Sequence, residues 1–300
     1  MLPNHGRFPY SPWSARSRES WPFGRKLAVY LGANLEHFAF GEGLGAELTP
    51  GANTGGGPQP DVANYCWREY GNRVGSFRLL QMLDELALPC TVLLNSAMYD
   101  YAPQIVAAHR ARGDEIAGHG RTNSERQSSL PEAEEARLVA DCTTAIRRHE
   151  GAAPRGWLSP WIAESRVTPD LLAEAGYRYT MNWCIDDQPL WMQTRGGRLL
   201  NIPYPHEAND IPSIIARKDS ADQFADIIID DLAERLRQTR DGVPQVMGIA
   251  LHPYIVGQPF RMRALRRALE FLAAHRDEVW ITTAGGIYDH CMTWPEGSIV

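Results

Sequence analysis

Apolar runs and helical patterns alternate along most of this chain. Strand-like apolar runs cover 27–35, 90–95, 114–119, 157–160, 177–185, 199–204, 246–251 and 279–283. Between them, apolar residues recur at helical spacing over 75–88, 103–112, 130–150, 167–176, 221–240 and 262–276. This alternation predicts an α/β fold on a parallel sheet. No Gly-x-Gly-x-x-Gly follows the first strand, so a barrel-like sheet fits better than a dinucleotide-binding one.

The chain divides into an arm and a body. Residues 1–24 carry Pro, Ser and aromatic residues without periodicity. We expect them to form an ordered arm on the body, because the aromatic side chains would be costly in water; these are Tyr10, Trp13, Trp21 and Phe23. Residues 25–300 are then one barrel domain. The Gly-rich stretch 41–60 reads as a long loop, and loops of this length are often functional.

Polar residues follow most of the predicted strands, at the end where a parallel barrel gathers its strand tips. In chain order they are Glu36, His37, His119, Asn123, Trp161, Asp186, Asp187, His206, Asn209, Asp210 and His252. Each has a structural alternative, such as a surface loop for Glu36 or a turn pair for Asp186 and Asp187. Convergence on one rim weakens these alternatives together and predicts an active site.

Composition excludes several classes of protein. Of 300 residues, 44% are hydrophobic and 22% charged, which is typical of a globular protein. The net charge of −6 gives no basic excess for nucleic acid, and no apolar run approaches the roughly 20 residues that span a bilayer. Five scattered cysteines without a Cys-x-x-Cys indicate reduced thiols. With no apolar signal core at the start, we expect a cytoplasmic protein.

The absence of two catalytic motifs limits the types of reaction that the sequence suggests. The chain has no Gly-x-Ser-x-Gly elbow and no catalytic cysteine signature, so attack by water is simpler than covalent acyl transfer. A divalent metal would rest on Glu36, His119 and Asn123, the last of which offers only a neutral amide oxygen. A metal-bound and a metal-free site therefore both stay open.

Five blocks in order resemble the polysaccharide deacetylase superfamily. They are REYGNRVGSFRLLQMLDELALPCTVLLN, GDEIAGHGRTNSERQ, GWLSPWIAESRVTPDLLAEAGYRY, DDQP and the long block that begins LHPYIVGQPF. The resemblance covers about residues 25–292 and is strongest to the allantoinase and cyclic imide hydrolase branch. It implies a distorted (β/α) barrel of about seven parallel strands, and hydrolysis of an amide C–N bond.

The chain departs from the pattern of the sugar deacetylases at two places. Their Asp pair after the first strand is Asn34-Leu35-Glu36 here, and their His-x-x-x-His runs from His119 to Asn123. These changes argue against ordinary sugar deacetylation and resemble the cyclic-amide branch, in which metal use varies between none and a cation such as zinc or manganese. The late His-Pro of the family matches His252, and its aspartate block matches Asp186 and Asp187.

The hypothesis assigns a role to each group. Glu36 activates a water molecule, directly or through a metal, and His119 binds that metal or polarises the carbonyl. His252 protonates the leaving nitrogen, and Asp186 or Asp187 orients the catalytic imidazole.

A second set is predicted to bind substrate. The members are Tyr65, Trp67, Tyr70, Arg73, Trp161, Trp183, Trp191 and Asn209. For the four residues before the 75–88 helix, packing of the long loop is an equally good interpretation. With the 41–60 loop and the arm closing the groove, an aromatic pocket favours a small cyclic amide. The alternatives are a carbohydrate N-deacetylase and an inactive binding barrel, and we expect a homo-oligomer that binds neither nucleic acid nor membrane.

Overall fold

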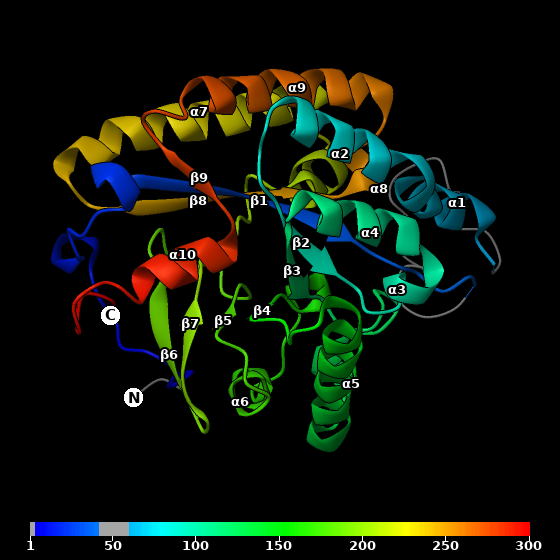
Figure 1. The fold of residues 1–300 in the computed structure, drawn as a ribbon, viewed down its shortest axis with the longest axis horizontal. Helices are drawn as coiled ribbons and strands as arrows, with labels where there is room; N and C mark the ends of the chain where they lie inside the picture. Colours follow the sequence, from blue (N-terminus) through cyan, green and yellow to red (C-terminus); the bar gives the residue numbers. More distant parts are fainter. Residues whose placement is uncertain (1–3, 42–59) are drawn as a thin grey trace.

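A mostly parallel sheet runs through the computed structural model, which describes residues 4–41 and 60–300 (Figure 1). Its strands are β1 Leu27–Leu35, β2 Thr91–Leu94, β3 Glu115–Gly118, β4 Gly156–Trp157, β5 Tyr179–Thr180, β6 Leu190–Thr194, β7 Gly197–Asn201, β8 Gln245–Leu251 and β9 Trp280–Thr282. The order is β6-β7-β5-β4-β3-β2-β1-β8, and β9 also pairs with β1. Every pairing is parallel except that of β6 with β7, so the predicted α/β class is confirmed.

The sheet is a distorted barrel that strand pairing does not close within the described residues, since β6 and β8 end the order. Irregular segments bind the open edge of β8 instead. The Val246 N–H donates to the Asp187 carbonyl at 2.8 Å, and the Ala250 N–H to the Ala208 carbonyl at 3.0 Å. The described residues form nine strands rather than about seven, and β6 is the strand that was not predicted, whereas β7 overlaps the predicted run 199–204.

Helices cover the sheet, and α7 and α9 lie side by side in Figure 1. The helices are α1 Val62–Tyr70, α2 Ser76–Glu85, α3 Met98–Tyr101, α4 Pro103–Arg112, α5 Glu132–Glu150, α6 Thr168–Glu174, α7 Ala221–Gln238, α8 Pro253–Val256, α9 Pro259–Ala274 and α10 Ala284–Cys291. None of these described helices is long and apolar enough to cross a bilayer.

β1 is buried along its whole length, which explains why its sequence is a continuous apolar run. Because successive side chains point to opposite faces, Leu27, Val29 and Leu31 pack into the core that includes residues of α2, α7 and α9. Tyr30 instead packs into a second core with Tyr179. Both faces of the strand are therefore apolar, and polar residues begin only where the strand ends.

The chain between α1 and α2 approaches α8 very closely through a π turn, Gly71–Gly75. A Cβ atom at Gly75 would lie 2.1 Å from the Pro253 carbonyl oxygen, and one at Gly71 would lie 2.7 Å from the Tyr254 nitrogen. Only glycine permits this contact without a backbone shift. It places α1 beside the segment that follows β8.

The arm lies on the body, but of the four aromatic side chains predicted to be buried there, only one is buried. Trp21 is buried against Trp280 and Trp294. Tyr10 and Phe23 are 90% and 87% exposed, and Trp13 is exposed as well, so their burial was predicted wrongly. Ion pairing holds the first part of the arm instead, because Arg7 binds Asp170 at 2.7 Å. The division into arm and domain stays a prediction, and residues 42–59 of the predicted loop lie outside the described residues.

Candidate active site

Three side chains from three strands meet at the carboxyl ends of β1, β3 and β8. The Nε2 atom of His119 lies 3.4 Å from Oε1 of Glu36, and Nε2 of His252 lies 3.6 Å from the same oxygen. All three side chains are buried. The convergence predicted for these residues is present, and their catalytic roles stay predictions.

Asp210 holds the imidazole of His252. Its Oδ1 lies 2.6 Å from Nδ1, and its Oδ2 accepts the backbone N–H of His252 at 2.7 Å. Burial disfavours the imidazolium, but the charges of Asp210 and Glu36 outweigh burial and raise the pKa of His252 to about 10. At neutral pH His252 is therefore protonated and can act as an acid.

His119 presents its other nitrogen to the same carboxylate. Its Nδ1 lies 2.7 Å from the Leu158 carbonyl oxygen, and because a carbonyl only accepts, Nδ1 carries the proton. Burial tends to raise the pKa of Glu36, but the two imidazoles outweigh it and lower that pKa. Oε2 of Glu36 has no hydrogen-bond partner among the described residues. A buried ionised oxygen without a donor is a natural position for a water molecule.

A cavity of about 180 Å³ lies over these groups. Aromatic side chains of Trp161, Tyr204 and Tyr254 line it, together with the amides of Asn34, Asn123 and Asn209. Trp161 and Asn209, both predicted to bind substrate, thus lie in the cavity. Its size suits one small ring-shaped molecule with polar groups at its floor.

The predicted metal ligands do not fit a metal site. The side-chain oxygen of Asn123 accepts from Asn95 at 2.9 Å, so only its second lone pair is left for a cation. In the parts of the chain that the structure describes, no group of three or more His, Cys, Asp or Glu side chains is placed to hold a metal ion. We therefore route no step of the reaction through a metal.

Comparison with known proteins shows which family part of the chain matches. Residues 69–180 match the polysaccharide deacetylase family model. A solved structure described as a probable polysaccharide deacetylase, from Pseudomonas aeruginosa PAO1, superposes with a TM-score of 0.78 at 25% identity, covering 93% of this chain and 95% of that one. The chain therefore contains a polysaccharide deacetylase domain and has structural neighbours in that superfamily.

Two further known proteins are similar to this chain. The structure of PuuE allantoinase has the same fold, with a TM-score of 0.75 at 24% identity over 90% of this chain and 91% of its own. A peptidoglycan deacetylase of Helicobacter pylori is 22% identical, covering 71% of this chain and 82% of its own. The comparisons confirm the predicted resemblance, and they support a hydrolase of non-peptide C–N bonds as the class of enzyme.

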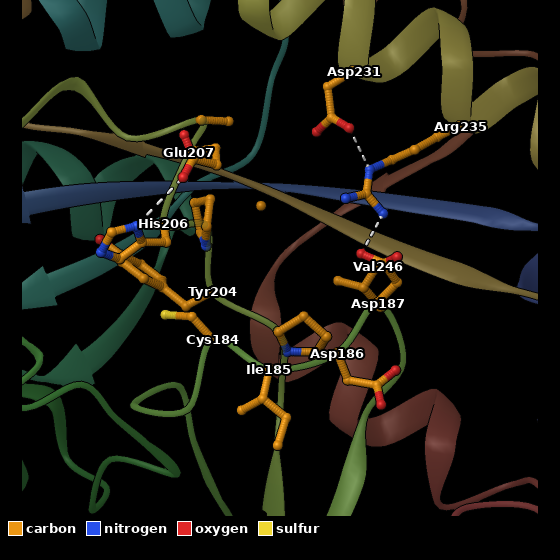
Figure 2. A pocket seen from close by; sticks show the side chains of 14 residues that line it. Cys184, Ile185, Asp186, Asp187, Tyr204, His206, Glu207, Asp231, Arg235 and Val246 are labelled. Atoms are coloured by element: carbon orange, nitrogen blue, oxygen red, sulfur yellow. Dashed lines mark hydrogen bonds and ion pairs between the residues drawn. The ribbon is translucent and has the colours of Figure 1, made fainter. Parts of the chain in front are cut away.

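Asp186 and Asp187 do not orient an imidazole, so that prediction was wrong. The Asp186 carboxylate pairs with Arg16, and that of Asp187 lies 2.8 Å from Arg235. Both residues line a separate cavity, of about 290 Å³, whose lining side chains are drawn in Figure 2. The reason is that β5 ends at Thr180, and the following chain lies beside the amino end of β8, opposite the end that carries His252.

The four residues predicted around α1 do not line the cavity either. Arg73 pairs with Glu69 and its side chain is 74% exposed. The hydroxyl groups of Tyr65 and Tyr70 lie 3.4 Å from the Tyr101 hydroxyl and from the Gly257 carbonyl oxygen, respectively. Trp67 packs edge-on against Tyr254, with ring centroids 4.8 Å apart, so it stands behind the cavity wall.

Two further tryptophans also lie elsewhere. Trp183 donates to Glu164 at 2.5 Å and lines a third cavity, and Trp191 packs under Arg198 on the β6–β7 hairpin. Three groups of the site had no assigned role from sequence: Asp210, Tyr204 and Tyr254. Asp210 belongs to the polar run after the 199–204 strand, and Tyr254 follows the His-Pro pair. The sequence therefore placed both residues at predicted strand ends, where a site was expected.

Proposed function

We propose that this protein opens the ring of a small cyclic amide, such as an imide or ureide, with an activated water molecule. The cavity carries the proposal: about 180 Å³ of space, walled by Trp161 and Tyr254, lies over a buried carboxylate and two imidazoles. A planar ring fits a small aromatic pocket, whereas a sugar polymer needs an open groove.

The catalytic role of each residue follows from which of its side-chain atoms is free to contact the substrate or water. The unpartnered Oε2 of Glu36 binds the water and takes one of its protons, while the hydroxide oxygen bonds to the carbonyl carbon. Nε2 of His119, which lies 3.4 Å from Oε1 of Glu36, polarises the scissile carbonyl by donating a hydrogen bond to its oxygen, a role that requires a proton on both ring nitrogens. The ring C–N bond then breaks, and protonated His252 supplies the proton that the leaving nitrogen takes up. The product carries a carboxylate at one end and the released nitrogen at the other.

The partners proposed follow from the same site. The substrate is a small molecule, and the net charge of −6 disfavours nucleic acid. The proposal also includes that the protein forms a homo-oligomer and is located in the cytoplasm.

A panel of substrates tests the function. Wild-type protein is incubated with succinimide, hydantoin, allantoin and N-acetylated chitooligomers, after chelation and then with added zinc or manganese. We expect ring opening of at least one cyclic amide, loss of roughly 10²–10⁴ in rate in Glu36→Gln, and wild-type rates in the exposed control Arg73→Met. Release of acetate alone would make the protein a carbohydrate deacetylase, and binding without any turnover would make it an inactive barrel.

A further inference from the structure

Arg68 places a buried cation beside the cavity. Its guanidinium carbon lies 4.1 Å from the ring centroid of Phe38, 5.4 Å from that of Tyr254 and 5.9 Å from that of Trp161. The side chain is nearly fully buried, and Nη1 has no hydrogen-bond partner among residues 4–41 and 60–300. Burying an unpartnered N–H of a charged group is unfavourable. The position of the Arg68 guanidinium against two rings of the cavity wall therefore indicates a functional role.

Tyr254 links this cation to the reacting groups. The tyrosine lines the cavity, and its ring centroid lies 5.7 Å from that of His252. Burial raises the pKa of Tyr254, the negative charge of Glu36 adds to that effect, and Arg68 opposes it. The phenol therefore keeps its proton and is a hydrogen-bond donor, while the guanidinium beside it strengthens that donor.

The pairing of Arg68 with Tyr254 is built into the backbone. Gly71 lies against the backbone of Tyr254, so the chain at the end of α1 approaches α8 closely enough that a side chain at Gly71 would clash. Arg68 is three residues before Gly71 and so sits on the helix face that meets Tyr254. On the same segment, Arg73 points to solvent.

We infer that Tyr254 is a further catalytic residue, which binds the second carbonyl oxygen of the cyclic substrate, and that Arg68 is a positioning residue acting through it. The inference rests on the proposed function. In an imide or ureide the leaving nitrogen carries a second carbonyl group. If His252 protonates that nitrogen, the second oxygen lies on the same side, next to Tyr254.

The second oxygen matters most as the C–N bond breaks. The electron pair of that bond moves onto the nitrogen and is shared with the second carbonyl oxygen until His252 delivers its proton. A donor at that oxygen binds the transition state better than the ground state and lowers the barrier. A lactam has only the scissile carbonyl, so the site discriminates against it. The substrate class is therefore a ring with a carbonyl on each side of the nitrogen.

Binding of a matched pair of ligands tests this inference. Glutarimide and δ-valerolactam are six-membered rings that differ by one carbonyl oxygen, and calorimetry measures their Kd values in a Glu36→Gln background that prevents turnover. We expect the parent to prefer glutarimide by about tenfold or more, as for a hydrogen bond to a charge-supported donor. Adding Tyr254→Phe or Arg68→Met should reduce the preference below about threefold by weakening glutarimide alone. Arg68→Lys keeps the charge and should retain part of the preference.

Two controls and three outcomes keep the result interpretable. Tyr70→Phe and Arg73→Met remove the same groups outside the cavity and should keep the full preference. If Arg68→Met does not fold, Tyr254→Phe still decides, because it removes one hydroxyl. A preference that survives Tyr254→Phe, a parent without preference, or no binding of either ring overturns the inference. The proposed function fails separately, when wild-type protein opens no cyclic amide.

Discussion

Asp210 forms hydrogen bonds with His252 at two points, with one carboxylate oxygen 2.6 Å from the ring Nδ1 and the other 2.7 Å from the backbone nitrogen. This double contact fixes both the position of the residue and the orientation of its ring, so that Nε2 points at Glu36. Asp210 thus does what was predicted for Asp186 or Asp187. It reaches the site because the segment after β7 crosses to the open edge of β8, where Ala250 binds Ala208.

Asp210→Asn should lower the upper pH limit of activity. The wild-type kcat/KM requires a protonated His252 and falls as the pH rises through about 10. Without the carboxylate that helps to raise this pKa, the alkaline limb should move to lower pH, and the rate at pH 8 should fall about 10²-fold. Rates measured from pH 5 to 11 check the shift. Asp187→Asn, which removes a carboxylate at the other end of β8, should leave the profile unchanged; an unmoved limb in Asp210→Asn would contradict the role of Asp210.

Asn95 organises the floor of the site and should tolerate no change of hydrogen-bonding character. Its side-chain oxygen accepts the His37 N–H at 2.8 Å, and its amide nitrogen donates to Asn123 at 2.9 Å and to the His119 carbonyl. Asn95→Asp keeps the shape but cannot donate, so two buried acceptors would face a carboxylate. We expect a loss of about 2–4 kcal/mol in the free energy of unfolding, measured in urea.

The neighbouring residue supplies the control for Asn95. Among the described residues, the hydroxyl of Ser96 makes one weak contact, with the sulfur of Cys142 at 3.6 Å. Ser96→Ala should therefore change the free energy of unfolding by less than about 0.5 kcal/mol. Equal effects of the two substitutions would show that Asn95 has no special part in holding the site.

Strand ends explain how far the sequence could predict the site. Glu36, His119 and His252 each follow a strand whose apolar run stops within one residue of the observed end, so their convergence followed from the parallel sheet alone. The 177–185 run failed because only Tyr179–Thr180 pairs as β5. Its aspartates therefore appeared to stand at a strand tip when they lie in an irregular crossing.

Helix faces could not be assigned without tertiary contacts. Tyr65, Trp67, Tyr70 and Arg73 were all candidates because no helix was predicted before residue 75, so no helix face could be assigned to them. Its orientation is set by the close contact of Gly71 and Gly75 with α8, and that contact depends on a partner about 180 residues later. Periodicity within α1 carries no information about such a partner, so Arg68 went unnoticed.

Gly75→Ala should destabilise the protein and disturb the site together. The new Cβ would lie 2.1 Å from the Pro253 carbonyl oxygen, a backbone atom that can move only with His252 beside it. We expect a loss of about 2–4 kcal/mol in the free energy of unfolding and a lower kcat. Arg73→Ala in the same turn removes only a surface ion pair and should cost less than about 1 kcal/mol. If Gly75→Ala were as stable as Arg73→Ala, the close contact would not exist in solution.

Glu164 should make the stability of the protein fall as the pH rises from about 4.5 to neutrality. Burial raises the pKa of this carboxyl to about 7, although Asn182 and Trp183 donate to it. A carboxyl whose folded pKa lies above its unfolded value near 4.5 binds its proton more tightly in the folded state. Relative to a variant without the charge, wild-type protein therefore loses stability between pH 4.5 and pH 7, by up to about 3 kcal/mol in all.

The comparison is between wild-type and Glu164→Gln, in urea at pH 5 and at pH 8. The lost acceptor should make the variant the less stable of the two at pH 5, and the difference should shrink or reverse at pH 8 because only the wild type must bury a charge there. Glu174→Gln makes the same chemical change at an exposed residue paired with Arg195 and should differ from the wild type equally at both values. A difference for Glu164→Gln that is the same at pH 5 and pH 8 would mean that this carboxyl ionises in the folded protein as it does in the unfolded chain.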